Sequence, residues 1–293
     1  MAQFILSAFA DEASDSLDGQ IEALLENGIY QIEPRFIDKK PILELSEEEL
    51  YEVSKKLSEN GIGVYSLGSP IGKYPIEAPF EAHLESFLKA IQVCKIFGAK
   101  NMRMFSFFVD KEKISEARET VFQRMRILLS IAEMAGIRLC HENEAKIYGE
   151  MPKEVLDLVE NLPSLHMIFD PANYRMAGAD IDEGIGATLK RLGYLHIKDA
   201  IFETQSIVPA GEGEGKIEEV LAKIDAFTDA TVTLTLEPHL FSFTAYQSID
   251  EHELKGTHHF ENSRESFAFA TTALKGILTK LGFKEGDDHI WKK

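Results

Sequence analysis

The sequence predicts an α/β protein with eight strand–helix pairs closed into a barrel, the (β/α)8 TIM barrel. Strand-like and helix-like segments alternate along the chain, which indicates a parallel sheet with helical crossovers. Eight such pairs fit into 293 residues, and this number favours a closed barrel over an open sheet. No linker, low-complexity tract or change of composition divides the chain, so we expect one domain over residues 1–293.

Strands are expected where short apolar runs alternate with polar residues or lie between turn signals. In chain order they span residues 3–9, 30–37, 63–67, 100–108, 137–144, 165–170, 194–198 and 231–237. Helices are expected where apolar residues recur at helical spacing and a glycine often follows the last turn. They span residues 18–27, 47–60, 79–97, 116–134, 152–160, 181–192, 216–227 and 264–281. The clearest start signal is the capping box Ser46-Glu47-Glu48-Glu49.

Composition and charge restrict the possible partners. The formal charge of −18 disfavours nucleic acid, which normally binds a basic surface, and it also disfavours phosphorylated substrates. No apolar stretch is long enough to span a membrane, and two cysteines fit a reducing compartment. We therefore expect a cytoplasmic protein with a small-molecule substrate, no nucleic-acid partner and no membrane partner.

Four neighbouring strands end in polar residues that are typical metal ligands. They are Glu142, Asp170, His196 and Glu237. In a barrel, side chains at the carboxyl ends of the strands point into one site. Three carboxylates and one imidazole suit a single divalent ion such as Mn²⁺, Mg²⁺ or Co²⁺, with Zn²⁺ also possible. The alternative is that each acid only caps the helix that follows it.

Side chains alternate along a strand, and this alternation adds further candidates. Lys198 shares a face with His196, and His239 shares a face with Glu237. We expect Lys198 and His239 to bind substrate hydroxyls. Glu33 and Arg35 share a face of the second strand, where they either contact substrate or form a buried ion pair that fills the barrel.

Several other features are expected to lie outside the site. His141 should face the surrounding helices, and Cys140 should pack inside the barrel below Glu142. The run from Gly211 to Lys216 lacks the spacing of a phosphate-binding loop, so we expect a mobile loop before the next helix. The long connection at residues 241–263 is expected to lie over the site face.

These residues occur in motifs that resemble the xylose isomerase-like (β/α)8 superfamily, in its sugar phosphate isomerase/epimerase branch. The resemblance covers essentially the whole chain. The motifs are Ile32-Glu33-Pro34-Arg35, Leu139-Cys140-His141-Glu142-Asn143, Phe169-Asp170-Pro171-Ala172-Asn173, His196-Ile197-Lys198-Asp199, the loop at Gly211-Glu212-Gly213, and Leu236-Glu237.

The resemblance implies that Glu142, Asp170, His196 and Glu237 bind one metal ion, with Glu142 and Glu237 also acting as acid and base. Asn173 stands where ketose 3-epimerases of the superfamily carry a substrate-binding histidine. Phe202 stands near the position of their substrate-binding arginine. These two differences set the chain apart from the ketose 3-epimerases, and we expect Asn173 to contact the substrate.

The predicted function is a metal-dependent isomerase or epimerase of a sugar, sugar phosphate or polyol. It would transfer a proton next to a carbonyl through an enediolate. A hydro-lyase of the inosose dehydratase type is the main alternative. A nuclease of the endonuclease four type and a non-catalytic binder of sugar or metal are further alternatives. Barrels of this kind often form dimers, so the sequence leaves the oligomeric state open between a monomer and a homodimer.

Overall fold

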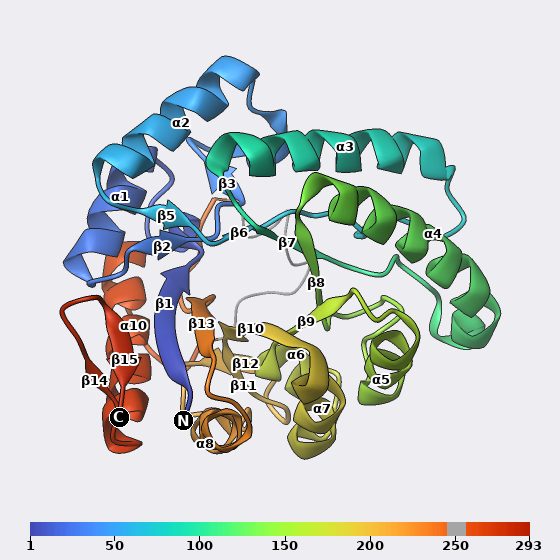
Figure 1. Cartoon of the computed structure of the whole chain (residues 1–293). Helices are drawn as coiled ribbons and strands as arrows, with labels where there is room; N and C mark the ends of the chain where they lie inside the picture. Colours follow the sequence, from blue (N-terminus) through green and yellow to red (C-terminus); the bar gives the residue numbers. More distant parts are fainter. Residues whose placement is uncertain (245–255) are drawn as a thin grey trace.

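The structure is a computed structural model that describes residues 1–244 and 256–293 of the chain. Figure 1 shows its helices arranged around a central ring of strands. The strands of the ring are β1 Gln3–Ala8, β2 Gln31–Ile32, β5 Gly63–Val64, β6 Ser66–Leu67, β7 Asn101–Met104, β8 Arg138–Glu142, β9 His166–Phe169, β10 Leu192–Ile197 and β13 Thr231–Leu236.

Every pairing within this ring is parallel. β1 pairs with β2 on one side and with β13 on the other, and β2 pairs with β5. The pairing continues from β6 through β7, β8, β9 and β10 to β13. Since β5 and β6 follow one another in the chain and share one position, the ring has eight positions and nearly closes on itself. The predicted TIM barrel is confirmed.

The helices cover the outside of the ring (Figure 1). They are α1 Leu17–Glu26, α2 Glu47–Glu59, α3 Phe80–Phe97, α4 Ile114–Ala135, α5 Pro152–Asn161, α6 Pro171–Met176, α7 Ile181–Thr188, α8 Ile217–Phe227 and α10 Ser263–Lys280. Apart from α6, each corresponds to a helix predicted from the sequence. The predicted helix at 181–192 ends early, because a 3-10 turn at Leu189–Arg191 follows α7.

The predicted helix boundaries have local causes. The Ser46 side chain accepts a hydrogen bond from the Glu49 backbone, and the Glu49 side chain accepts one from the Ser46 backbone, which completes the predicted capping box. Gly98 and Gly136 end α3 and α4 with φ angles of 67° and 71°. This left-handed conformation strains residues that carry a Cβ, so glycine favours the helix end there.

The second and third strands differ from the prediction. Residues 30–37 were expected to form one strand, but β2 stops at Ile32 and the chain then turns into a hairpin of β3 Phe36–Ile37 and β4 Lys40–Pro41. Pro34 lies at this break and has no N–H for a strand ladder. The third position is divided at Tyr65, where pairing passes from β2 to β7.

Two hairpins were not predicted. The strands β11 Asp199–Ile201 and β12 Ser206–Val208 form one directly after β10. The strands β14 Lys284–Glu285 and β15 Ile290–Lys292 form the other, near the C-terminus. β15 also pairs antiparallel with the beginning of β1, so the two ends of the chain lie side by side.

The core is apolar, whereas the carboxyl ends of the strands are polar. Cys140, Ile168 and Tyr194 form a small buried cluster, which confirms that Cys140 packs in the core. A larger core packs strands against helices, with fully buried Phe87 and Phe122 among its members. The buried polar residues Glu142, Asp170, His196 and Glu237 lie at the carboxyl ends of the strands, where the site is expected.

The long connection after β13 is only partly described. Within the predicted 241–263 connection, residues 245–255 lie outside the described residues, and the expectation that the connection covers the site face falls on them. Before this gap, the ring centroid of Phe243 lies 5.6 Å from the ring centroid of His239 and 5.3 Å from the guanidinium carbon of Arg35. Within residues 1–244 and 256–293, no helix has the length and apolar character needed to cross a bilayer.

Candidate metal centre

Four polar side chains lie at the carboxyl ends of neighbouring barrel strands. Glu142 is the last residue of β8, and Asp170 directly follows β9. His196 lies one residue before the end of β10, and Glu237 directly follows β13. Parallel strands end at one edge of a barrel, so the four side chains enter the same region.

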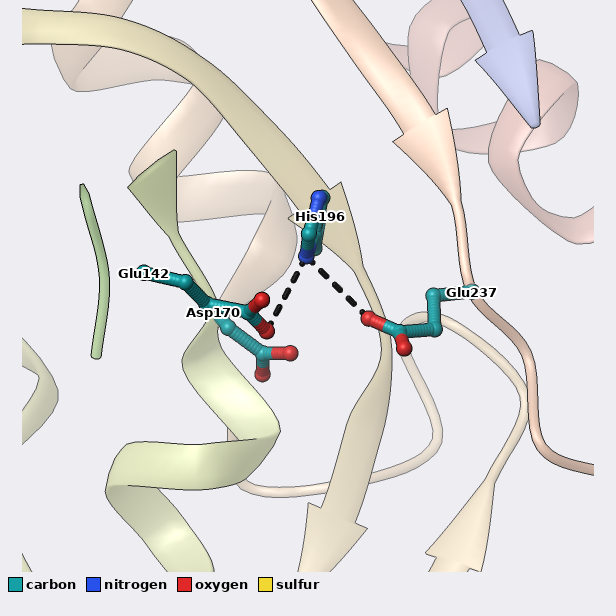
Figure 2. Close-up of side chains that lie close together, drawn as sticks. All are labelled: Glu142, Asp170, His196 and Glu237. Atoms are coloured by element: carbon teal, nitrogen blue, oxygen red, sulfur yellow. Dashed lines mark ion pairs between the residues drawn. The ribbon is translucent and has the colours of Figure 1, made fainter. Parts of the chain in front are cut away.

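One donor atom from each of the four residues lies within 4.8 Å of the other three. Figure 2 shows the carboxylates of Glu142 and Glu237 facing the same nitrogen of the His196 ring. This nitrogen, Nδ1, is 3.1 Å from Glu142 Oε1 and 3.1 Å from Glu237 Oε2. All four residues are almost fully buried, with at most 2% of any of them exposed. The structure thus brings the four predicted ligands together.

Three possible metal-binding atoms of this cluster lack hydrogen bonds. Among residues 1–244 and 256–293, Asp170 Oδ2, His196 Nδ1 and Glu237 Oε2 are buried and have no hydrogen bond of normal geometry. Buried polar atoms in native proteins usually have a partner, which can be an ion. Three carboxylates and one imidazole are ligands that divalent cations accept. The chemistry of the cluster therefore fits a divalent metal ion.

Each glutamate of the cluster is held by a buried arginine. Arg103 Nη1 donates to Glu142 Oε2 at 3.2 Å, and Arg35 Nη1 donates to Glu237 Oε1 at 2.8 Å. The opposite carboxylate oxygen of each glutamate faces His196. The two arginines therefore orient both carboxylates toward the centre of the cluster.

The charges of the site also set the ionisation of the two glutamates. Burial alone would raise the pKa of Glu142, but His196 and Arg103 outweigh burial and lower this pKa to about 2. Burial is likewise outweighed at Glu237, where Lys198 and His196 hold the pKa well below its ordinary value. Both side chains are therefore carboxylates at neutral pH, the form that can bind a cation or accept a proton.

The side chain of Arg35 is buried and forms ion pairs with three carboxylates. Its Nε donates to Asp11 Oδ2 at 2.9 Å and its Nη2 donates to Glu12 Oε1 at 2.8 Å, in addition to the bond with Glu237. The residue is 3% exposed, and its guanidinium carbon lies 4.2 Å from the centroid of the Phe9 ring. These contacts make Arg35 a positioning residue for Glu237, and the predicted contact of Arg35 with substrate stays a prediction.

Glu33 is also fully buried and lies on the other side of His196. Its Oε1 accepts a hydrogen bond from Tyr194 Oη at 2.6 Å, and its Oε2 is 3.5 Å from His196 Nε2. The ion pair between Glu33 and Arg35 that the sequence allowed is not among the contacts of either residue in the described parts of the chain. Arg35 instead pairs with acids that follow other strands, because its side chain points toward Glu237.

Lys198 and Asn173 lie beside the four predicted ligands. Lys198 Nζ is 3.0 Å from Asp170 Oδ2 and 3.7 Å from Glu237 Oε2. Asn173 is the third residue of α6, and its Nδ2 donates to Glu142 Oε1 at 3.3 Å. Asp170 caps the same helix, because its Oδ1 accepts a hydrogen bond from the Asn173 backbone. Asp170 thus caps a helix through one oxygen and directs the other into the cluster.

His239 joins the cluster to the 3-10 turn Ala10–Glu12 that follows β1. Its backbone N–H donates to Glu12 Oε2 at 2.7 Å, and its Nε2 is 3.5 Å from Glu237 Oε1. Burial, opposed by Arg35 and assisted by Glu237 and Asp11, raises the pKa of Glu12 to about 8. The two oxygens of this carboxyl accept from Arg35 and from the His239 backbone, so Glu12 is held next to the predicted ligand Glu237.

The glycine-rich run after β12 binds a carboxylate of the protein itself. Asp199 accepts hydrogen bonds from the backbone N–H groups of Gly211, Gly213 and Gly215, at 2.9, 3.1 and 2.8 Å. A Cβ on Gly213 would lie 2.3 Å from Asp199 Oδ1. The side chain of Asp199 thus anchors this loop through contacts that the sequence did not predict, and the mobility of the loop stays a prediction.

His141 lies away from the four ligands, as predicted. Its Nε2 is 2.8 Å from Ser106 Oγ, and the ring fits against Gly149, where a Cβ would come within 2.8 Å of it. Burial lowers the pKa of His141 to about 3, so the ring is neutral at neutral pH. We assign it a packing role.

The sequence reasoning did not identify Asp11, Glu12 and Arg103. The two acids follow shortly after β1, the kind of position that marks the four predicted ligands, so that rule applied to the first strand would have found them. Arg103 lies inside β7 and is surrounded by apolar residues in the sequence. Its contact with Glu142 depends on pairing between β7 and β8, which the sequence does not display.

Comparisons with known proteins agree with this fold. The chain matches the family described as xylose isomerase-like TIM barrel over residues 21–254. A search of curated proteins found no match.

Solved structures with the same fold include several enzymes. The IolI protein with a zinc atom has a TM-score of 0.72 and 17% identity, with 94% of this chain and 98% of that chain covered. The probable 3-DHS dehydratase AsbF from Bacillus anthracis has a TM-score of 0.70 and 13% identity, with coverage of 92% and 98%. An L-ribulose 3-epimerase has a TM-score of 0.65 and 17% identity, with coverage of 96% and 97%.

At these identities the structural likeness establishes the fold alone. The family match covers most of the chain, and the observed ring of parallel strands is the architecture that the family's description names. The chain therefore belongs to the xylose isomerase-like TIM-barrel family.

Proposed function

We propose that this protein is a metal-dependent isomerase or epimerase of a sugar or a related polyol, which moves a proton next to a carbonyl. The observation that carries the proposal is the arrangement of Glu142 and Glu237. Each presents one carboxylate oxygen at 3.1 Å from the same nitrogen of His196, and each is ionised. Two carboxylates that face one centre can serve a substrate from two sides.

The residues that would hold the ion are Glu142, Asp170, His196 and Glu237. When bound there, a divalent ion would polarise a substrate carbonyl and stabilise the negative charge that follows proton loss. The buried atoms of the cluster that lack hydrogen bonds, Asp170 Oδ2, His196 Nδ1 and Glu237 Oε2, support this assignment. The residues favour a hard or borderline cation such as Mn²⁺, Mg²⁺, Co²⁺ or Zn²⁺.

The side chains of the site would divide the remaining work. One glutamate accepts the proton from the carbon next to the carbonyl, which leaves an enediolate, and the other carboxyl returns a proton. A proton returned to the opposite face of the same carbon gives an epimer, and one returned to the neighbouring carbon gives an isomer. Lys198, Asn173 and His239 would bind substrate hydroxyls, since all three lie beside the cluster.

Dehydration is the second candidate, and the position of Lys198 favours it. Its buried ammonium group lies between Asp170 and Glu237, where it could protonate a hydroxyl as that group leaves. In this reaction a glutamate takes the proton from carbon, the C–O bond breaks, and Lys198 supplies the proton that completes the water. The shared fold with a probable dehydratase makes this alternative worth testing.

Proton exchange with solvent tests the proposal. The metal-loaded protein is incubated in D₂O with a panel of ketoses, aldoses and inososes, and the products are followed by NMR. We expect deuterium next to the carbonyl and a new epimer or isomer. Glu142→Gln and Glu237→Gln should each reduce the rate by about a hundredfold or more, because general base catalysis contributes on this scale. Glu160→Gln on the exposed side of α5 should not.

The other outcomes separate the alternatives. A product lighter by one water identifies a hydro-lyase instead. Exchange that persists at near-normal rate in either glutamine variant contradicts the two-glutamate scheme. Cleavage of abasic DNA would reveal a nuclease, which the charge of −18 disfavours. Metal binding without turnover of any substrate would leave a metal or sugar binder.

A further inference from the structure

The two ring nitrogens of His196 face different environments. Nδ1 faces the carboxylates of Glu142 and Glu237, both at 3.1 Å. Nε2 points the other way and lies 3.5 Å from Glu33 Oε2. A neutral imidazole carries its proton on one nitrogen and a lone pair on the other, so the group next to Nε2 decides which nitrogen can bind a cation.

Glu33 is not one of the four clustered ligands but is held in place beside them. The side chain is 0% exposed, and its Oε1 accepts the hydrogen bond from Tyr194 Oη at 2.6 Å. The same hydroxyl lies 2.9 Å from Ser66 Oγ, so Ser66 can donate to Tyr194 while Tyr194 donates to Glu33. Ser66 belongs to β6 and Tyr194 to β10, so the contacts cross the interior of the barrel.

The second oxygen of Glu33 lacks a donor. Within the described parts of the chain, Glu33 Oε2 has no hydrogen bond, and His196 Nε2 has none either. Their separation of 3.5 Å exceeds a normal hydrogen bond by a few tenths of an ångström. An N–H on Nε2 is therefore the donor that this buried carboxylate oxygen needs, and a small rotation of the ring would complete the bond.

Two aromatic rings also pack against the ring of His196. The Phe9 ring forms a T-shaped contact with it, with centroids 5.0 Å apart, and the Tyr194 ring forms another at 5.5 Å. These contacts limit the space in which the ring can rotate. Packing thus restricts the orientation of His196, and the group next to Nε2 remains to set its tautomer.

We propose that Glu33, Tyr194 and Ser66 are positioning residues that hold His196 as the Nε2–H tautomer, so that the Nδ1 lone pair faces the metal centre. Buried acceptors of this kind raise the basicity of a metal-binding histidine and fix its ring. The inference rests on the proposed metal centre. It assigns to Glu33 a contact with His196 in place of a contact with substrate.

The test uses zinc as the probe and does not require turnover. Protein with ¹⁵N-labelled histidine is loaded with Zn²⁺, and the His196 signals are assigned by their absence in His196→Gln. We expect a protonated Nε2 and a metal-bound Nδ1 in the wild type. Glu33→Gln should weaken zinc binding by about 10–100-fold in a calorimetric titration and shift the Nε2 signal. Tyr194→Phe should shift the same signal by a smaller amount.

Tyr174→Phe is the matched control, because Tyr174 is as fully buried as Tyr194 but lies on α6 outside this set of contacts. It should leave zinc affinity and the His196 signals unchanged. The melting temperature of each metal-free variant separates a general loss of folding from a change at His196.

The outcomes distinguish the two proposals. If the wild type binds zinc in a His196-dependent way but Glu33→Gln changes neither affinity nor the Nε2 signal, the positioning role is wrong and the metal centre stands. If the wild type shows no zinc binding that depends on His196, the metal centre is wrong and the positioning role falls with it.

Discussion

At the scale of single residues, the site is organised by charges that balance one another within a few ångströms. Glu142 and Glu237 each use one oxygen to accept from a buried arginine and direct the other toward His196. The arginines therefore do for the glutamates what we propose Glu33 does for the histidine. Such partners fix the direction of a ligand before any ion or substrate arrives, as precise sites require.

Replacement of Arg35 by methionine should destabilise the protein strongly. The change leaves Asp11, Glu12 and Glu237 buried without their common cation, and breaking a buried ion pair by removing one partner costs about 3–5 kcal/mol. The free energy of unfolding in urea at neutral pH measures the loss.

Arg126→Met is the control for this prediction. Arg126 pairs with Glu119 at 3.8 Å on the exposed side of α4, and an exposed pair of this kind contributes about 0–1 kcal/mol. Equal losses in the two variants would show that Arg35 contributes no more to stability than a surface arginine, and would contradict its role as the common partner of three buried acids.

Sequence reasoning found the candidate ligands but not the residues that hold them. Glu142, Asp170, His196 and Glu237 share one visible property, a polar residue at the end of an apolar run. Arg103 has no such mark, because its role comes from the pairing of β7 with β8. The roles of Glu33 and Arg35 could not be separated either, since alternation tells which face a side chain occupies but not which partner it meets.

At the scale of elements, helices were easier to predict than strands. Their ends carry local signals such as the capping box at Ser46 and the glycines at positions 98 and 136. Strand length also depends on how far a neighbouring strand runs beside it, although the early end of β2 has a local cause, the missing N–H of Pro34. The hairpin of β14 and β15 was not predicted, because its position beside β1 depends on pairing with a strand far away in the sequence.

The loop held by Asp199 yields a prediction at this scale. Gly213→Ala should destabilise the protein by about 1–3 kcal/mol, because the new Cβ would meet Asp199 Oδ1 and the carboxylate would lose backbone donors. Thermal unfolding monitored by circular dichroism measures the change.

Gly186→Ala on α7 is the matched substitution. A Cβ at Gly186 meets no atom within 4 Å, so alanine should stabilise the helix by about 0.5–1 kcal/mol. Opposite signs for the two variants are expected. A neutral or stabilising effect of Gly213→Ala would contradict the close packing of the Asp199 carboxylate against the glycine-rich loop.

At the scale of the whole molecule, the barrel collects acids from many strands at one buried place. The chain carries a formal charge of −18, and the cluster places several carboxylates within the protein interior. Burial, opposed by Lys198 and assisted by Glu237 and Glu142, raises the pKa of Asp170 to about 7. A bound cation would reduce the repulsion between these carboxylates.

We also propose that residues 1–293 form one domain, since β15 pairs with β1 and so joins the two ends of the chain.

An anomalous-difference map from crystals grown with Zn²⁺ tests the metal centre most directly. We predict one peak between Glu142, Asp170, His196 and Glu237, with His196 coordinated through Nδ1 at about 2.0–2.1 Å, the usual zinc–nitrogen distance. Zinc found only elsewhere on the protein, or no peak among these four side chains at saturating zinc, would contradict the proposed metal centre.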